Sequence, residues 1–108
     1  MKLKIGRKIK CIVSEPWDFK SSKGKNMISG IICDYTFTKY GDAYLLKSDE
    51  VFTIESLQVQ YMVMTYRHKE IDPEGFNIYY IPDDKVSQFQ NVDNIEEYLV
   101  FIIIGSVQ

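Results

Sequence analysis

The stretch Leu57–Tyr66, Leu-Gln-Val-Gln-Tyr-Met-Val-Met-Thr-Tyr, decides the fold class of this chain of 108 residues. Side chains alternate between the two faces of a β-strand, and β-branched and aromatic residues favour its pleated surface. With this period of two, one face carries Leu57, Val59, Tyr61, Val63 and Thr65, and the other carries Gln58, Gln60, Met62, Met64 and Tyr66. The second face is polar at its start and apolar at its end. The pattern predicts a long strand that begins half-exposed and ends covered on both sides.

The flanking sequence predicts six further strands, most of them bounded by turn residues. These strands cover residues 8–13, 27–40, 43–47, 51–54, 76–81 and 99–104. Gly30 predicts a bulge or a bend within the second of them, a device that curls sheets into barrels. Turns are expected at residues 48–50 and at Asp72-Pro73-Glu74-Gly75, where proline and glycine occupy favoured β-turn positions.

The helical signals are confined to residues 83–98. Asp83 or Asp84 can cap a short turn, and Asp93 followed by Glu96 fits a capping box. About seven short strands with closely spaced turns are typical of an antiparallel β-sandwich or a small barrel. We therefore expect residues 1–108 to form a single, mainly β domain, with one or two short helices near residues 83–98.

The inventory of nucleophilic and metal-binding side chains argues against catalysis. Cys11 and Cys33 fall within apolar runs, so we expect two reduced thiols in the core. His68 is the single histidine of the sequence, and we expect it at the solvent-exposed end of its predicted strand. One histidine and two separated cysteines cannot close a zinc site, and no phosphate-binding glycine motif is present. We predict no enzyme activity, no cofactor and no metal.

Charge is unevenly distributed along the chain. Residues 1–25 hold eight basic and two acidic residues, whereas residues 26–108 hold five basic and thirteen acidic ones. Within residues 70–97, eight acids accompany one base, Lys85, and tyrosines are interspersed. Acids that steer association and tyrosines that anchor it suit a strongly basic protein partner. The alternative is a solvated acidic rim with the tyrosines in the core.

Small size, acidic regions and the lack of catalytic motifs together resemble the immunity proteins of bacterial toxin–immunity pairs, including contact-dependent growth inhibition systems. The resemblance implies a cytoplasmic inhibitor that covers the active site of a basic, nuclease-type toxin. The start of the sequence lacks the continuous apolar segment of a signal peptide, and residues 99–104 are too short to span a bilayer. The predicted partner-binding residues are Asp72, Glu74, Tyr79, Asp83, Asp84, Glu96 and Glu97.

Binding of single-stranded nucleic acid is the alternative function. Small β-barrels bind single strands through a basic groove and aromatic platforms. Lys8 and Lys10 are expected to point outward from the first strand. The aromatic and basic residues of the loop that follows are Trp17, Phe19, Lys20, Lys23 and Lys25. In the alternative interpretation these residues bind nothing: Trp17 packs over the core as a lid, and the lysines are solvated.

Overall fold

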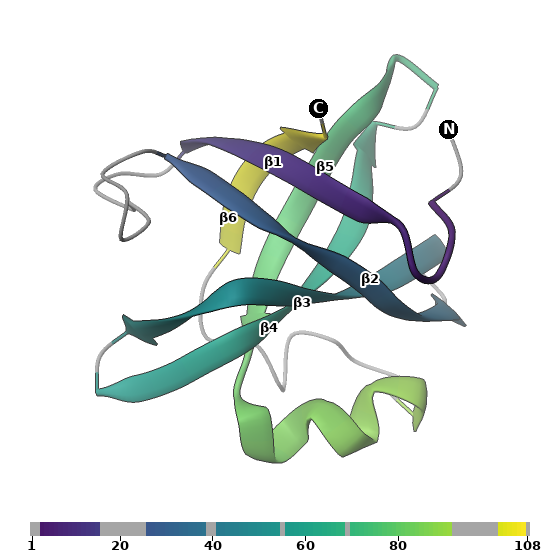
Figure 1. Cartoon of the computed structure of the whole chain (residues 1–108). Helices are drawn as coiled ribbons and strands as arrows, with labels where there is room; N and C mark the ends of the chain where they lie inside the picture. The colour runs from purple at the N-terminus through teal and green to yellow at the C-terminus, as the bar shows by residue number, and fades with distance from the viewer. Residues whose placement is uncertain are drawn as a thin grey trace.

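A computed structural model describes residues 3–15, 26–38, 41–54, 56–68, 70–91 and 102–107 (Figure 1). Within them the strands are β1 (Lys8–Glu15), β2 (Met27–Thr38), β3 (Gly41–Ile54), β4 (Leu57–His68), β5 (Asp72–Ile81) and β6 (Ile102–Val107). Asp83–Asn91 forms the 3-10 helix η1. The strands β1 to β5 form a curled antiparallel sheet, and β6 closes it into a barrel by pairing with both β5 and β1.

The mainly β, antiparallel prediction is confirmed, but the described residues contain six strands where seven were expected. Residues 43–47 and 51–54 belong to one strand, β3, because the chain bulges at residues 48–50 instead of turning. Pairing with β4 moves from Lys47 opposite Tyr61 to Phe52 opposite Val59, so β3 is locally longer than its partner. The Gln60 side chain bridges this irregularity, since its Nε2 donates to the Ser48 carbonyl at 3.1 Å.

Two further local predictions are corrected at the ends of β5 and β6. The turn expected at residues 72–75 lies earlier, at Glu70 and Ile71, and β5 already begins at Asp72. A proline is tolerated near the start of a strand, where its missing N–H costs little. Gly105 does not end the last strand but pairs within β6, opposite Val13 and Phe76.

The helical prediction is confirmed for its first part, where η1 lies. Residues 92–98 and the first residues of the predicted last strand, 99–101, lie outside the described parts of the chain. None of the described residues belongs to a helix with the length and apolar character needed to span a bilayer.

Side chains from β1 to β5 fill the barrel interior. Tyr44, Tyr80 and Phe76 are the largest of its fully buried side chains, and Met62 and Met64 of β4 are fully buried as well. Small barrels are filled in this way by inward-facing side chains. These side chains of the described strands therefore form one contiguous apolar core inside the barrel.

The central strand β4 follows the predicted alternation only in its second half. Met62 and Met64 face the barrel core, whereas Val63 faces outward into a second apolar cluster beneath η1. Strict alternation would place Val59 with Val63, yet Val59 belongs to the barrel core. The strand changes face near Gln60, opposite the bulge of β3, so the two-face pattern read from the sequence is wrong for the first half.

Cys33 of β2 does not lie where the sequence predicted it. Ile28 and Ile32 face the core, while Ile31 and Cys33 are exposed. Pairing with β3 shifts at Cys33, which inserts an extra residue into the strand. Cys33 is thus a free, exposed thiol and not the core residue that we expected, whereas Cys11 is buried and free as predicted.

Candidate functional site

Three of the seven predicted partner-binding residues have described side chains, and these three lie where β5 leads into η1. Tyr79 is half-buried on the outer face of β5, and Asp83 and Asp84 are exposed in the first turn of η1. Asp72 and Glu74 occupy the opposite end of β5. At about 3.3 Å per residue, the two ends of this strand are roughly 30 Å apart along the chain.

The structure therefore keeps the predicted acidic residues in two separate places. Asp83 and Asp84 form one pair, while the positions of Asp72 and Glu74 belong to the far end of β5. Residues 96 and 97, the remaining two predicted positions, lie outside the described residues.

The first turn of η1 is held by one hydrogen bond within the turn and by one hydrogen bond to the barrel. Pro82 follows the end of β5, and its carbonyl accepts a hydrogen bond from the Lys85 N–H at 2.9 Å. Asp83 Oδ1 accepts a hydrogen bond from the backbone N–H of Gln60 at 3.3 Å. Because Gln60 belongs to β4, this contact joins the start of the helix to the central strand.

The last turn of η1 is tied to β2. Gln90 Nε2 donates to Asp34 Oδ1 at 2.7 Å and to the Tyr35 carbonyl at 2.9 Å. Both acceptors lie directly after the β2 bulge at Cys33. The helix is consequently held at both ends. Figure 1 shows it below β3 and β4 in that view.

An apolar cluster lies beneath η1, outside the barrel. Phe89 is 2% exposed and packs with outward-facing residues of three strands. These residues are Ala43, Leu45, Val63 and Ile81. Tyr61 and Tyr79 pack against the cluster and remain partly exposed. We define the η1 surface as Tyr61, Tyr79, Asp83 and Asp84.

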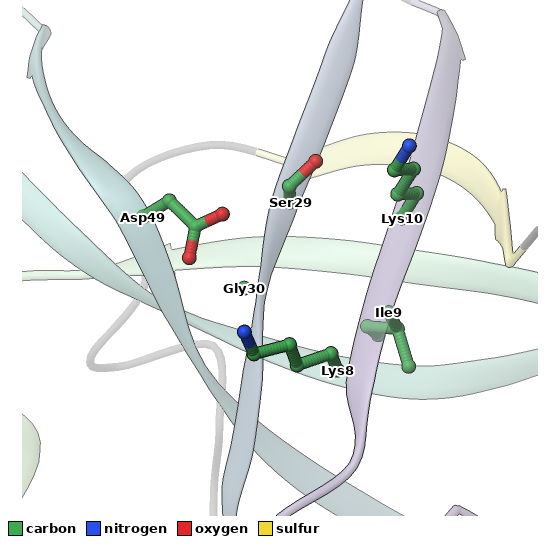
Figure 2. A pocket seen from close by; sticks show the side chains of 6 residues that line it. All are labelled: Lys8, Ile9, Lys10, Ser29, Gly30 and Asp49. Carbon is green, nitrogen blue, oxygen red and sulfur yellow. The ribbon is translucent and has the colours of Figure 1, made fainter.

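A basic depression lies on a different part of the outer surface, over β1, β2 and β3. Lys8 and Lys10 are exposed and point outward as predicted, because Ile9 between them faces the core. A pocket of about 290 Å³ opens beside them, and Figure 2 shows its lining. It is lined by Lys8, Ile9, Lys10, Ser29, Gly30 and Asp49.

The sequence revealed the lysines of this depression but not its other residues. Alternation along residues 8–13 is sufficient to turn Lys8 and Lys10 outward. Ser29 and Asp49 join them only through the pairing of β1 with β2 and of β2 with β3, which no local pattern discloses. The predicted nucleic-acid-binding residues of the β1–β2 connection, at positions 17, 19, 20, 23 and 25, lie outside the described residues, so that prediction stays open.

The two thiols and the buried tyrosine hydroxyls of the described strands are neutral at physiological pH. Burial raises the pKa of the Cys11 thiol to about 12. Cys33 is exposed, but partial desolvation by its neighbours, and next the carboxylate of Asp34, still raise the pKa of its thiol. Burial likewise raises the pKa of Tyr44 and Tyr80. A thiol nucleophile requires a lowered pKa, so these cysteines lie in the wrong environment for that chemistry.

Across the described ranges, no group of three or more histidine, cysteine, aspartate or glutamate side chains is placed to hold a metal ion. No protein-family profile, curated protein or solved structure matches the chain. The described residues present two charged surfaces on one barrel. One is the pair of carboxylates on η1, near Tyr61 of β4 and Tyr79 of β5, and the other is the group of ammonium side chains around the depression over β1 and β2.

Proposed function

We propose that this chain is a non-enzymatic inhibitor of the immunity type, which binds a basic, nuclease-type toxin in the cytoplasm and covers its active site. The observation that carries the proposal is the placement of Asp83 and Asp84. Both carboxylates are exposed, and both belong to a helix that hydrogen bonds and an apolar cluster hold against the barrel. Charges on a fixed support complement a basic site with little ordering cost on binding.

The neighbouring tyrosines supply the second requirement of a protein interface. Tyr61 and Tyr79 are partly buried, so their rings are already ordered before a partner arrives. Aromatic side chains with one exposed edge are frequent anchors of protein–protein interfaces. The η1 surface therefore combines steering charges with ordered apolar area, as binding to a basic protein requires.

The geometry also narrows the contact region expected from the sequence. A standard interface buries about 800 Å² on each partner, which corresponds to a patch roughly 30 Å across. A patch of that diameter that included both Asp83 and the positions of Asp72 and Glu74, roughly 30 Å apart along β5, would hold them at its opposite edges, whereas binding energy concentrates near the centre of an interface. The proposed contact is centred on the η1 surface for that reason.

The test uses the toxin domain encoded next to the gene for this chain. We expect co-expression to restore growth, and the two proteins to co-purify. Asp83→Lys combined with Asp84→Lys should slow association about tenfold at low salt and weaken its salt dependence. Asp49→Lys, a change of an exposed carboxylate on β3, serves as the matched control and should have a smaller effect.

Two results would contradict the proposal. The function is wrong if the neighbouring gene product is not toxic or does not bind the chain. The assignment to the η1 surface is wrong if the double charge reversal leaves the association rate and its salt dependence unchanged while the complex still forms.

A further inference from the structure

Strand pairing places a row of long side chains across the outside of β1, β2 and β3. Lys8 lies opposite Ile31, and Ile31 lies opposite Lys47. In the next row Lys10 lies opposite Ser29, and Asp49 follows on the far side of the depression. The face is therefore basic on its β1 side and mixed on its β3 side.

The depression exists because β2 contributes little bulk at its centre. On the outer face of β2, Ser29 carries only a short side chain, and Lys8 and Lys10 of β1 lie beside it (Figure 2). Gly30 is required for a separate reason, since a Cβ there would collide with the Lys47 carbonyl of the adjacent strand. The close approach of β2 to β3 thus fixes the floor of the depression.

Lys8 and Lys10 place two positive charges on the same outer side of β1. Residues two apart on one side of a strand are about 7 Å apart, similar to successive phosphates of an extended single strand. Lysine binds phosphate as a mobile point charge, and the Ser29 hydroxyl adds a further donor between the strands. Lys4 and Arg7, both exposed, precede β1 and extend the positive charge.

Apolar side chains beside the lysines provide contacts that do not depend on charge. Ile31 and Ile12 are 37% and 44% exposed on the same outer face. Sugars and base edges of a single strand can pack on such aliphatic groups. Lys47 contributes less, because its Nζ lies 6.0 Å from the centre of the Tyr61 ring, toward β4.

We propose that the outer face of β1 and β2 is a second binding site, which takes the sugar–phosphate backbone of single-stranded nucleic acid. The contacts are made by Lys8, Lys10 and Ser29, with Ile31 and Ile12 beside them. Two lysines whose backbone positions are about 7 Å apart, with a hydroxyl and aliphatic side chains beside them, suit a sugar–phosphate backbone, which carries both charge and apolar surface. The site uses none of the η1 residues, so it does not depend on the proposed inhibitor function.

Asp49 has the same charge as such a ligand. Removing this charge should therefore change the affinity in one predictable direction. Its exposed carboxylate lines the depression on the side of β3, toward which Lys8 extends (Figure 2). A phosphate that enters the depression is repelled by this group. Asp49→Asn should consequently tighten binding, whereas a site elsewhere on the molecule would leave affinity nearly unchanged.

The experiment is fluorescence anisotropy of the full chain with labelled oligothymidine and oligouridine of about twelve nucleotides, within the usual range of site sizes. We expect binding that weakens as salt rises. Each phosphate neutralised on a single strand contributes about 0.7 to the slope of log affinity against log salt. Lys8→Ala combined with Lys10→Ala should therefore lower this slope by about 1.4. Lys85→Ala, on η1, is the matched control and should leave it unchanged.

The outcomes separate this site from its alternatives. No binding at low salt overturns the proposal, and so does a double lysine variant that binds with the wild-type slope. Displacement of the oligonucleotide by poly-glutamate as effectively as by unlabelled oligothymidine overturns the assignment to nucleic acid. Circular dichroism of each variant confirms that it is folded, because exposed lysines on β1 are not needed by the core.

Discussion

Phe89 is the residue whose removal most directly tests how η1 is held on the barrel. It is 2% exposed and packs among the outward-facing residues of β3, β4 and β5 beneath the helix. Its ring belongs to the small outer cluster, not to the barrel core. We predict that Phe89→Ala loosens η1 while the strands of the barrel stay paired.

The expected loss can be estimated from the burial of this ring. Replacing a buried phenylalanine by alanine usually costs about 3–5 kcal/mol, of which part is the cavity left behind. The cost here is limited, because a helix at the surface can detach once its anchor is lost, and the cavity then disappears. We therefore expect a loss of about 3 kcal/mol in the free energy of unfolding, the lower end of the range.

Urea unfolding monitored by circular dichroism measures this loss, and hydrogen exchange locates it. The amides of η1 should exchange faster in Phe89→Ala, while those of β4 should change much less. Ser87→Ala, at an exposed position of the same helix, is the control and should change stability by less than about 0.5 kcal/mol. A loss below about 1 kcal/mol, or uniform acceleration of exchange across the barrel, would refute the anchoring role.

Two other predictions concern the barrel itself. Gly30→Ala should lower the free energy of unfolding by about 2–3 kcal/mol in urea titration, because its Cβ would collide with the Lys47 carbonyl, whereas Ser29→Ala should be nearly neutral. The free energy of unfolding should also fall as pH rises above 9. The pKa of the Cys11 thiol is raised from 9.0 to about 12 in the folded state, so this thiol loses its proton first in the unfolded chain. The slope from this thiol is about 1.4 kcal/mol per pH unit, and buried Tyr44, whose pKa is also raised, adds to it at higher pH. Urea titrations at successive pH values that show constant stability above pH 9 would contradict the burial of these groups.

Residue alternation predicts the faces of a strand well only where the strand has no bulge. In β1 it placed Lys8 and Lys10 outside and Ile9 and Cys11 inside, and the structure agrees. In β4 the rule fails near Gln60, opposite the bulge of β3, where Val59 joins Met62 and Met64 in the barrel core. A bulge depends on the fit between neighbouring strands, so it leaves no reliable local signal.

The candidate site illustrates the difference between closeness in sequence and closeness in space. Asp72 and Asp83 are separated by only ten residues, yet the strand between them carries them to opposite ends of β5. A strand rises more than 3 Å per residue, so the separation follows as soon as the strand is recognised. The joining of Asp83 to Gln60 has no such signal, because it depends on how β5 leads into η1 across β4.

The uneven charge of the sequence becomes a separation of charge in space. The basic strand β1 pairs with β2 and β6. The helix η1 packs on the outside of β4 and reaches β2 only at its end. Figure 1 shows β1 and η1 on different sides of the barrel. The molecule measures 33 × 30 × 25 Å along its principal axes, and the Debye length at 0.1 M salt is about 10 Å. At that ionic strength the two surfaces are electrostatically independent, so charge reversal on η1 should leave oligonucleotide affinity unchanged. At 0.01 M salt the Debye length grows to about 30 Å, and the same reversal should then strengthen oligonucleotide binding. The contrast between the two salt concentrations distinguishes two separate surfaces from one continuous binding face.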